Sequence, residues 1–122
     1  MIFVIDSDEV MARCIARACE KVVGRGEVMV FPEALSAMAE IGDGVVPEMI
    51  IMDVMLTGPD GFTFLNEMIS YEDTAKVPVV MISEVDFAGK DLSVYGVVAT
   101  LDKDDFTPGD VMGLVRRYAG RS

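Results

Sequence analysis

Four short apolar runs in this chain each end in polar or charged residues. The runs span residues 2–5, 49–52, 79–82 and 97–101, and they are followed by Asp6, Asp53, Ser83 and Asp102-Lys103. An unbroken apolar run of this length is typical of a strand that is buried on both faces, as in a parallel sheet. The carboxyl ends of parallel strands lie along one edge of the sheet, where open α/β sheets bind their ligands. The sequence therefore predicts that these polar residues gather at one edge.

The residues expected at this edge form a set with a defined chemistry. Carboxylates such as Asp6 and Asp53 suit a hard cation, and a carboxylate is also a nucleophile. A hydroxyl and an ammonium, here Ser83 and Lys103, can hold phosphoryl oxygens. One isolated Asp after a strand would more simply cap the following loop. Because the pattern recurs at four strand ends, we favour a functional site.

Helical periodicity between the runs completes an alternating pattern. The sequence predicts helices over residues 8–23, 32–41, 61–71 and 108–118, and a further short strand over 27–31. Pro32 is expected in the first turn of the second helix. Residues 86–95 are expected to form a short, weakly held helix, since Gly89 falls in the middle. Strands that alternate with helices indicate a parallel sheet with helices on both faces.

The four longer helices carry specific expectations. Thr107, Pro108 and Asp110 fit an N-cap, a proline at the first position and a variant of the capping box. The apolar stripes of the second and third helices are expected to be Ala34, Leu35, Met38 and Ile41, and Phe62, Leu65, Met68 and Ile69. On the first helix, Cys14 and Cys19 lie about 140° apart around the axis. They are therefore expected to form no disulfide, and both are interpreted as small core side chains.

Composition narrows the function classes. At 122 residues the chain is expected to form one domain, residues 1–122, and a hydrophobic content of 52% is too high for a disordered chain. The formal net charge of -11 argues against direct binding to nucleic acid or to an anionic membrane. The absence of His argues against a zinc site. With no apolar run long enough for a membrane span and no signal peptide, a cytoplasmic location is expected.

The chain resembles the receiver domains of two-component response regulators from Ile2 to about Tyr118. The resemblance rests on four motifs in order and at nearly the family's spacing: Phe3-Val4-Ile5-Asp6, Met52-Asp53-Val54-Met55-Leu56 with Gly58-Pro59-Asp60-Gly61, Pro78-Val79-Val80-Met81-Ile82-Ser83, and Lys103. It implies a flavodoxin-like, doubly wound sheet of five parallel strands in the order 2-1-3-4-5, with helices on both faces.

The resemblance also implies a role for each site residue. Asp53 would accept a phosphoryl group from a histidine kinase or phosphotransfer protein. Mg²⁺ would be held by Asp6, Asp53 and the backbone carbonyl of Met55. Ser83 would hydrogen-bond the phosphoryl group, and Lys103 would form an ion pair with it. The protein would then be no enzyme beyond Mg²⁺-dependent self-phosphorylation and self-dephosphorylation at Asp53, and it would signal to a downstream protein.

Several positions depart from the family's pattern. Ser7 replaces the second of two consecutive acids, and Asp8 comes one position too late. Glu84 stands where the family prefers a small residue, and Thr100 stands where an aromatic residue moves inward on activation. Thr57 and Asp104 replace common prolines, so the Lys103-Asp104 bond is expected to be trans. These departures leave an alternative open, in which the fold is a protein docking module that works without phosphorylation.

Two enzyme interpretations are weaker. No Gly-rich or hydroxyl-rich phosphate loop follows the first strand, as a flavin mononucleotide protein would require. Asp53-Val54-Met55 lacks the second Asp of an aspartyl phosphatase. The output surface is expected to comprise residues 86–95, the last strand and the last helix, and the last strand and helix are also where a homodimer would form. Nothing after Gly120 indicates direct DNA binding.

Overall fold

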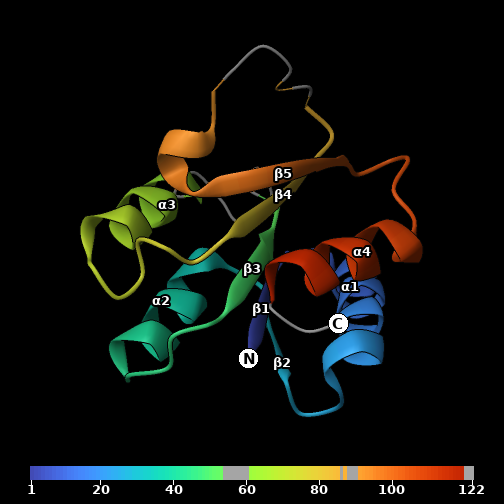
Figure 1. Ribbon diagram of the computed structural model, residues 1–122, viewed down its shortest axis with the longest axis horizontal. Helices are drawn as coiled ribbons and strands as arrows, with labels where there is room; N and C mark the ends of the chain where they lie inside the picture. Colours follow the sequence, from blue (N-terminus) through green and yellow to red (C-terminus); the bar gives the residue numbers. More distant parts are fainter. Residues whose placement is uncertain (54–60, 86, 88–90, 120–122) are drawn as a thin grey trace.

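The computed structural model describes residues 1–53, 61–85, 87 and 91–119, and Figure 1 shows their arrangement. The elements in chain order are β1 (Ile2–Ile5), α1 (Glu9–Val23), β2 (Val28–Phe31), α2 (Ala34–Gly42), β3 (Met49–Met52), α3 (Gly61–Ser70), β4 (Val79–Ser83), the 3₁₀ turn η1 (Ser93–Tyr95), β5 (Val97–Asp102) and α4 (Pro108–Tyr118). The five strands are all parallel and lie in the order β2-β1-β3-β4-β5. The predicted topology is confirmed.

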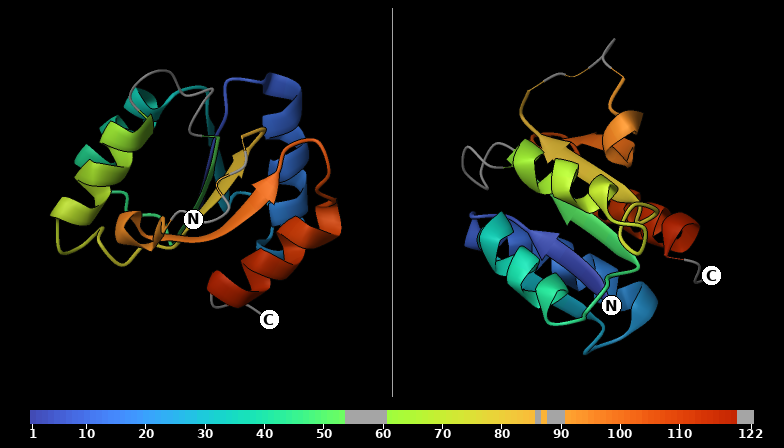
Figure 2. Two further views of the ribbon diagram at one scale, coloured as in Figure 1. Left: turned by 90° about the horizontal axis from the view of Figure 1, so that it is seen from above. Right: turned by 90° about the vertical axis from the view of Figure 1, so that its left-hand side faces the viewer.

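The sheet lies between two helical layers (Figure 2). Helices α1 and α4 cover one face, and α2, α3 and η1 lie on the other. Successive strand residues point to opposite faces: Phe3 and Ile5 pack toward α2 and α3, whereas Ile2 and Val4 pack toward α1 and α4. All residues of β1, β3 and β4 are buried, which explains why these strands appear as unbroken apolar runs.

The strand register brings the carboxyl ends of the strands level with one another. Ile5 pairs with Met52, so that Asp6 and Asp53 leave neighbouring strands at the same height. Ser83 pairs with Asp102, which places Lys103 one residue beyond. Backbone hydrogen bonds extend past the strands: Asp53 N–H donates to Ile5 O over 3.0 Å, and Lys103 N–H donates to Ser83 O over 3.0 Å. The backbone of these residues is therefore fixed by the sheet.

The helix expected over residues 86–95 is not observed in the part of this segment that the structure describes. Residues 91 and 92 are not helical, and only Ser93–Tyr95 form a 3₁₀ turn. The side chain of Asp91 accepts the N–H of Ser93 over 3.0 Å, a local bond that competes with helical hydrogen bonding. Gly96, at φ 80°, then ends the turn in a conformation that favours glycine.

Some expected buried faces were wrong in detail. In α2, Ala34 and Ala37 are buried, whereas Leu35 is 66% exposed. Leu35 lies about 100° around the helix from Ala34 and so falls outside the stripe. Pro32 precedes α2, whose N-cap is Glu33. Cys14 is exposed and only Cys19 is buried, and burial raises the pKa of the Cys19 thiol to about 12.

The apolar face of α3 is also turned from its expected position. Phe64 is buried although the sequence pattern missed it, and Phe62 and Ile69 are only half-buried. Phe62 lies at the flank of α3, where its ring contacts Tyr95 with centroids 5.4 Å apart.

Both cysteines are free, and no helix among the described residues is long and apolar enough to cross a membrane.

The start of α4 gives a test of local stability. The Thr107 hydroxyl accepts the N–H of Asp110 over 3.2 Å, and the Asp110 carboxylate accepts the N–H of Thr107 over 2.9 Å, which confirms the capping box. We expect Thr107→Ala to lower the free energy of unfolding by about 1 kcal/mol. Gly113→Ala, in the same helix and with open space for a Cβ, should raise it by about 1 kcal/mol. Urea unfolding measures both, and an unchanged Thr107→Ala variant would contradict the role of the cap.

Candidate functional site

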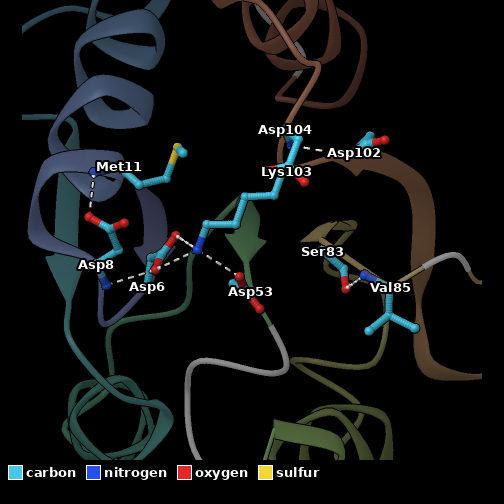
Figure 3. Close-up of polar contacts among 9 residues, drawn as sticks. All are labelled: Asp6, Asp8, Met11, Asp53, Ser83, Val85, Asp102, Lys103 and Asp104. Atoms are coloured by element: carbon cyan, nitrogen blue, oxygen red, sulfur yellow. Dashed lines mark hydrogen bonds and ion pairs between the residues drawn. The ribbon is translucent and has the colours of Figure 1, made fainter.

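A buried ammonium group links the two carboxylates at the carboxyl edge of the sheet. Lys103 Nζ lies 2.8 Å from Asp53 Oδ2 and 3.3 Å from Asp6 Oδ2. Figure 3 shows the Lys103 side chain reaching across from the end of β5 to both aspartates. Asp6 and Asp53 are each 2% exposed and Lys103 is 7% exposed. The structure therefore brings together three of the four residues that the sequence placed at this edge.

Burial and pairing act in opposite directions on these groups. Burial alone lowers the pKa of Lys103, but the hydrogen bond to Asp53 and the negative charges of both aspartates outweigh it, and the pKa is raised. Burial raises the pKa of Asp6, against the opposing effects of the Asp8 backbone N–H and the Lys103 ammonium. With both carboxyls ionised, one cation faces two anions, so the cluster keeps a net negative charge.

The fourth residue, Ser83, lies at the same edge on the other side of Asp53 from Asp6 (Figure 3). It is 5% exposed, and its Oγ accepts the N–H of Val85 over 2.9 Å. A hydroxyl that accepts one hydrogen bond still has its own proton to donate. Ser83 is therefore held beside the aspartates as a donor.

The loop between β1 and α1 decides what the acidic residues can do. Ser7 is exposed, and the Asp8 side chain accepts the N–H of Met11 over 3.1 Å as the N-cap of α1. The backbone N–H of Asp8 donates to Asp6 Oδ1 over 2.9 Å and thereby orients that carboxylate. The side chain of Asp8 thus caps the helix, whereas its backbone supports the cluster.

No group of three or more His, Cys, Asp or Glu side chains suited to a metal ion occurs among residues 1–53, 61–85, 87 and 91–119. Asp6 and Asp53 remain as two oxygen donors, which fits a cation such as Mg²⁺ that keeps several waters. Met55, the third expected ligand through its carbonyl, lies outside the described residues, as does Thr57.

Glu84 and Thr100, two of the departures from the family's pattern, lie beside the cluster. Glu84 and Thr100 are exposed, and both line a cavity of about 230 Å³ together with Ser83, Val85, Phe87, Leu101 and Asp102. Glu84 therefore borders the site at the surface and is not buried in it. The described residues contain no cis peptide bond, so the trans Lys103-Asp104 bond is confirmed.

One supporting residue was missed at the sequence level. The Asp102 side chain accepts the N–H of Asp104 over 2.9 Å, and its backbone carbonyl accepts the N–H groups of Asp105 and Phe106 over 3.1 Å each. These bonds fix the turn that follows Lys103 (Figure 3). The Asp-x-Asp spacing at 102–104 is the available signal, since Asp side chains often bind the backbone N–H two residues on.

Comparison with known proteins identifies this arrangement. A family model described as the response regulator receiver domain matches residues 2–114. The chain belongs to this family. The receiver domain of NtrX from Brucella abortus superposes with a TM-score of 0.78 at 25% identity, with 100% of both chains covered. CheY4 of Vibrio cholerae gives 0.80 at 18% identity over 96% of each chain.

A third solved structure is the Mn²⁺-bound form of the response regulator Rcp1, with a TM-score of 0.74 and 20% identity over 93% of this chain and 90% of that one. No curated protein sequence gave a significant match. Receiver domains are signalling modules of two-component systems rather than conventional enzymes. Phosphorylation of an Asp, a divalent cation at an acidic pocket, and contacts with histidine kinases or phosphotransfer proteins are general features of the family.

The buried Lys103 ammonium in this receiver domain predicts that the stability of the fold depends on pH. Removing the ammonium with Lys103→Met takes the cation away from two buried carboxylates, which we expect to cost about 3 kcal/mol or more near pH 7.5. The cost should shrink toward pH 4, because the pKa of Asp6 is already raised and rises further without the cation, so that a proton replaces it.

At high pH the wild type should lose the same contribution. Since the pKa of Lys103 is raised in the folded state, its stabilising effect is complete below the ordinary value of 10.5 and is lost as pH rises through the higher folded value. Urea unfolding of wild type, Lys103→Met and Asp6→Asn/Lys103→Met across this range measures the effect. The double variant should recover stability near pH 7.5, and a Lys103→Met cost independent of pH would contradict the account.

Proposed function

We propose that this receiver domain accepts a phosphoryl group on Asp53 from a histidine kinase or phosphotransfer protein, with Mg²⁺ as cofactor, and signals through protein contacts. The observation that carries the proposal is the buried ammonium of Lys103, held 2.8 Å from Asp53 Oδ2. A fixed positive charge beside a carboxylate lowers the cost of bringing a further anion to that carboxylate. The family membership of the chain supports the same conclusion.

The chain's own residues supply three functions in this reaction. A carboxylate oxygen of Asp53 attacks phosphorus, and the bond between phosphorus and the donor atom breaks as the new P–O bond forms. Lys103 is already within hydrogen-bonding distance of the attacked group and balances one phosphoryl charge. Ser83 Oγ accepts the N–H of Val85, and its own hydroxyl proton can therefore be donated to a phosphoryl oxygen.

Asp6 and Asp53 would hold the Mg²⁺, together with the carbonyl of Met55 in the family's pattern. The net negative charge of the cluster favours a cation at this place. When bound, Mg²⁺ offsets the charge of the incoming phosphate. Binding is expected to be weak, since Ser7 contributes no carboxylate and Asp8 is engaged in capping α1.

The second candidate is a docking module that works without phosphorylation. Two observations favour it: Lys103 already pairs with both carboxylates, and Ser7 leaves the loop after β1 one carboxylate short of the family's pattern.

In either case, we propose that the output surface comprises residues 86–95, β5 and α4, which is also where a homodimer would form. Val94 and Val98, on this surface, are 62% and 40% exposed.

Phosphoryl transfer is tested by intact mass after incubation with a small phosphodonor and Mg²⁺. Wild type should gain one phosphoryl group slowly, and Asp53→Asn should gain none. Because Glu84 is a surface charge beside Ser83, Glu84→Ala should accelerate the gain by roughly two- to fivefold, the range of an exposed charge interaction. Glu72→Ala, which removes an exposed charge elsewhere, is the matched control and should leave the rate unchanged. No gain in wild type and Glu84→Ala would favour the docking module, and a gain in Asp53→Asn would exclude Asp53 as acceptor.

Metal binding is tested by titration with Mg²⁺. Ser7→Asp should tighten binding by at least roughly tenfold, since residues around a bound metal typically change its affinity by 10- to 100-fold. Asp8→Asn is the matched control: it removes a nearby charge but keeps an N-cap residue, and it should change affinity little. An unchanged affinity for Ser7→Asp would show that this position does not face the cation.

A further inference from the structure

A second cavity lies between α2 and α3, away from the aspartates. The two helices lie side by side on one face of the sheet (Figure 2), and the second half of α2, the middle of α3 and the segment that follows α3 line a cavity of about 350 Å³. Its lining residues are Met38, Ile41, Gly42, Phe64, Glu67, Met68, Tyr71, Asp73 and Thr74. Because α2 leads into the first residue of β3 and Asp53 follows its last, the cavity and Asp53 lie at opposite ends of that strand.

The floor of this cavity is apolar and leaves no buried polar group to be satisfied. Phe64 and Met68 are buried, and the Thr74 hydroxyl donates to the carbonyl of Met68 over 2.6 Å. Methionine side chains are flexible and adapt to varied apolar groups. The apolar part of a ligand would thus fill this cavity, and the polar end of the ligand would have to lie at the rim.

The rim is negatively charged. Glu67 and Asp73 are exposed there, and none of the described lining residues carries a positive charge. The last turns of α2 and α3 also contain no basic residue, in contrast with Lys21 in α1 and with the two arginines that end α4. The partial negative charge at a helix C-terminus therefore adds to that of the carboxylates.

We propose that this cavity binds a small organic cation with an apolar body, such as an arylalkyl amine. The volume of about 350 Å³ lies at the lower end of the range for small-molecule sites. Tyr71, which is 59% exposed, places an aromatic ring at the mouth, where a cation can lie over its face. The site is separate from the phosphoryl-acceptor cluster, and the proposal does not rest on the function proposed for that cluster.

The test uses three probes of similar shape and different charge: phenethylamine, phenethyl alcohol and hydrocinnamate. Each is titrated into the full chain at pH 7 while backbone amide shifts are followed by NMR. Phenethylamine should cause saturable shifts in the last turns of α2 and α3, the alcohol should bind several-fold more weakly, and the carboxylate should not bind. High salt should weaken amine binding. Equal binding of amine and alcohol, or amine shifts confined to other regions, would overturn the proposal.

Variants separate this site from general attraction to an acidic protein. Glu67→Gln and Asp73→Asn should each weaken amine binding by roughly two- to fivefold. Glu72→Gln, an exposed neighbour that does not line the cavity, should have no effect. Gly42→Leu should block the cavity without unfolding α2, because a Cβ at Gly42 meets no atom within 4 Å. An equal loss in Glu72→Gln, or undiminished binding in Gly42→Leu, would contradict the site.

Discussion

The contact of Lys103 with Asp53 and Asp6 is the interaction on which the carboxyl edge of this sheet depends. Two carboxylates that are almost wholly excluded from water would be costly side by side without a cation between them. The ammonium reaches both, at 2.8 Å and 3.3 Å, and so balances part of their negative charge. Since it comes from the end of β5, it also ties that strand to β1 and β3 at the centre of the sheet.

The same interaction explains how the site tolerates a reduced acidic set. With an ammonium between the two carboxylates, part of their charge is balanced within the protein itself. The loop between β1 and α1 supports two structures at once, because Asp8 begins the helix through its side chain and orients Asp6 through its backbone. A second carboxylate directly after Asp6 would have to stand at position 7, where the exposed Ser7 lies.

The two faces of the sheet are covered by helices that differ in length, in the charge of their last turns and in how closely they pack together. Helices α1 and α4 pack against one another and against the sheet, and each has at least one basic residue in its last turn that balances its dipole. On the other face, α2 and α3 are shorter, end without basic residues and leave a cavity between them. Beyond α3, the described residues of 86–95 supply only the turn η1, so the exposed side of β5 carries Val98 and Thr100 at the surface.

The sequence pattern alone determined the sheet, the parallel direction of its strands and the edge where Asp6, Asp53, Ser83 and Lys103 lie, and the family resemblance supplied the strand order. Burial on both faces requires apolar runs, and the polar residues that end them must reach the edge. Tertiary structure decided the rest. Which side of α2 and α3 is buried depends on how each helix is turned against the sheet, and neighbouring residues lie about 100° apart around the axis, so Leu35 and Phe64 were misassigned. The 3₁₀ turn at Ser93–Tyr95 reflects competition between the Asp91 side chain and helical bonding. Whether Asp8 would cap α1 or join the cluster depended on where its side chain points, which spacing alone does not specify.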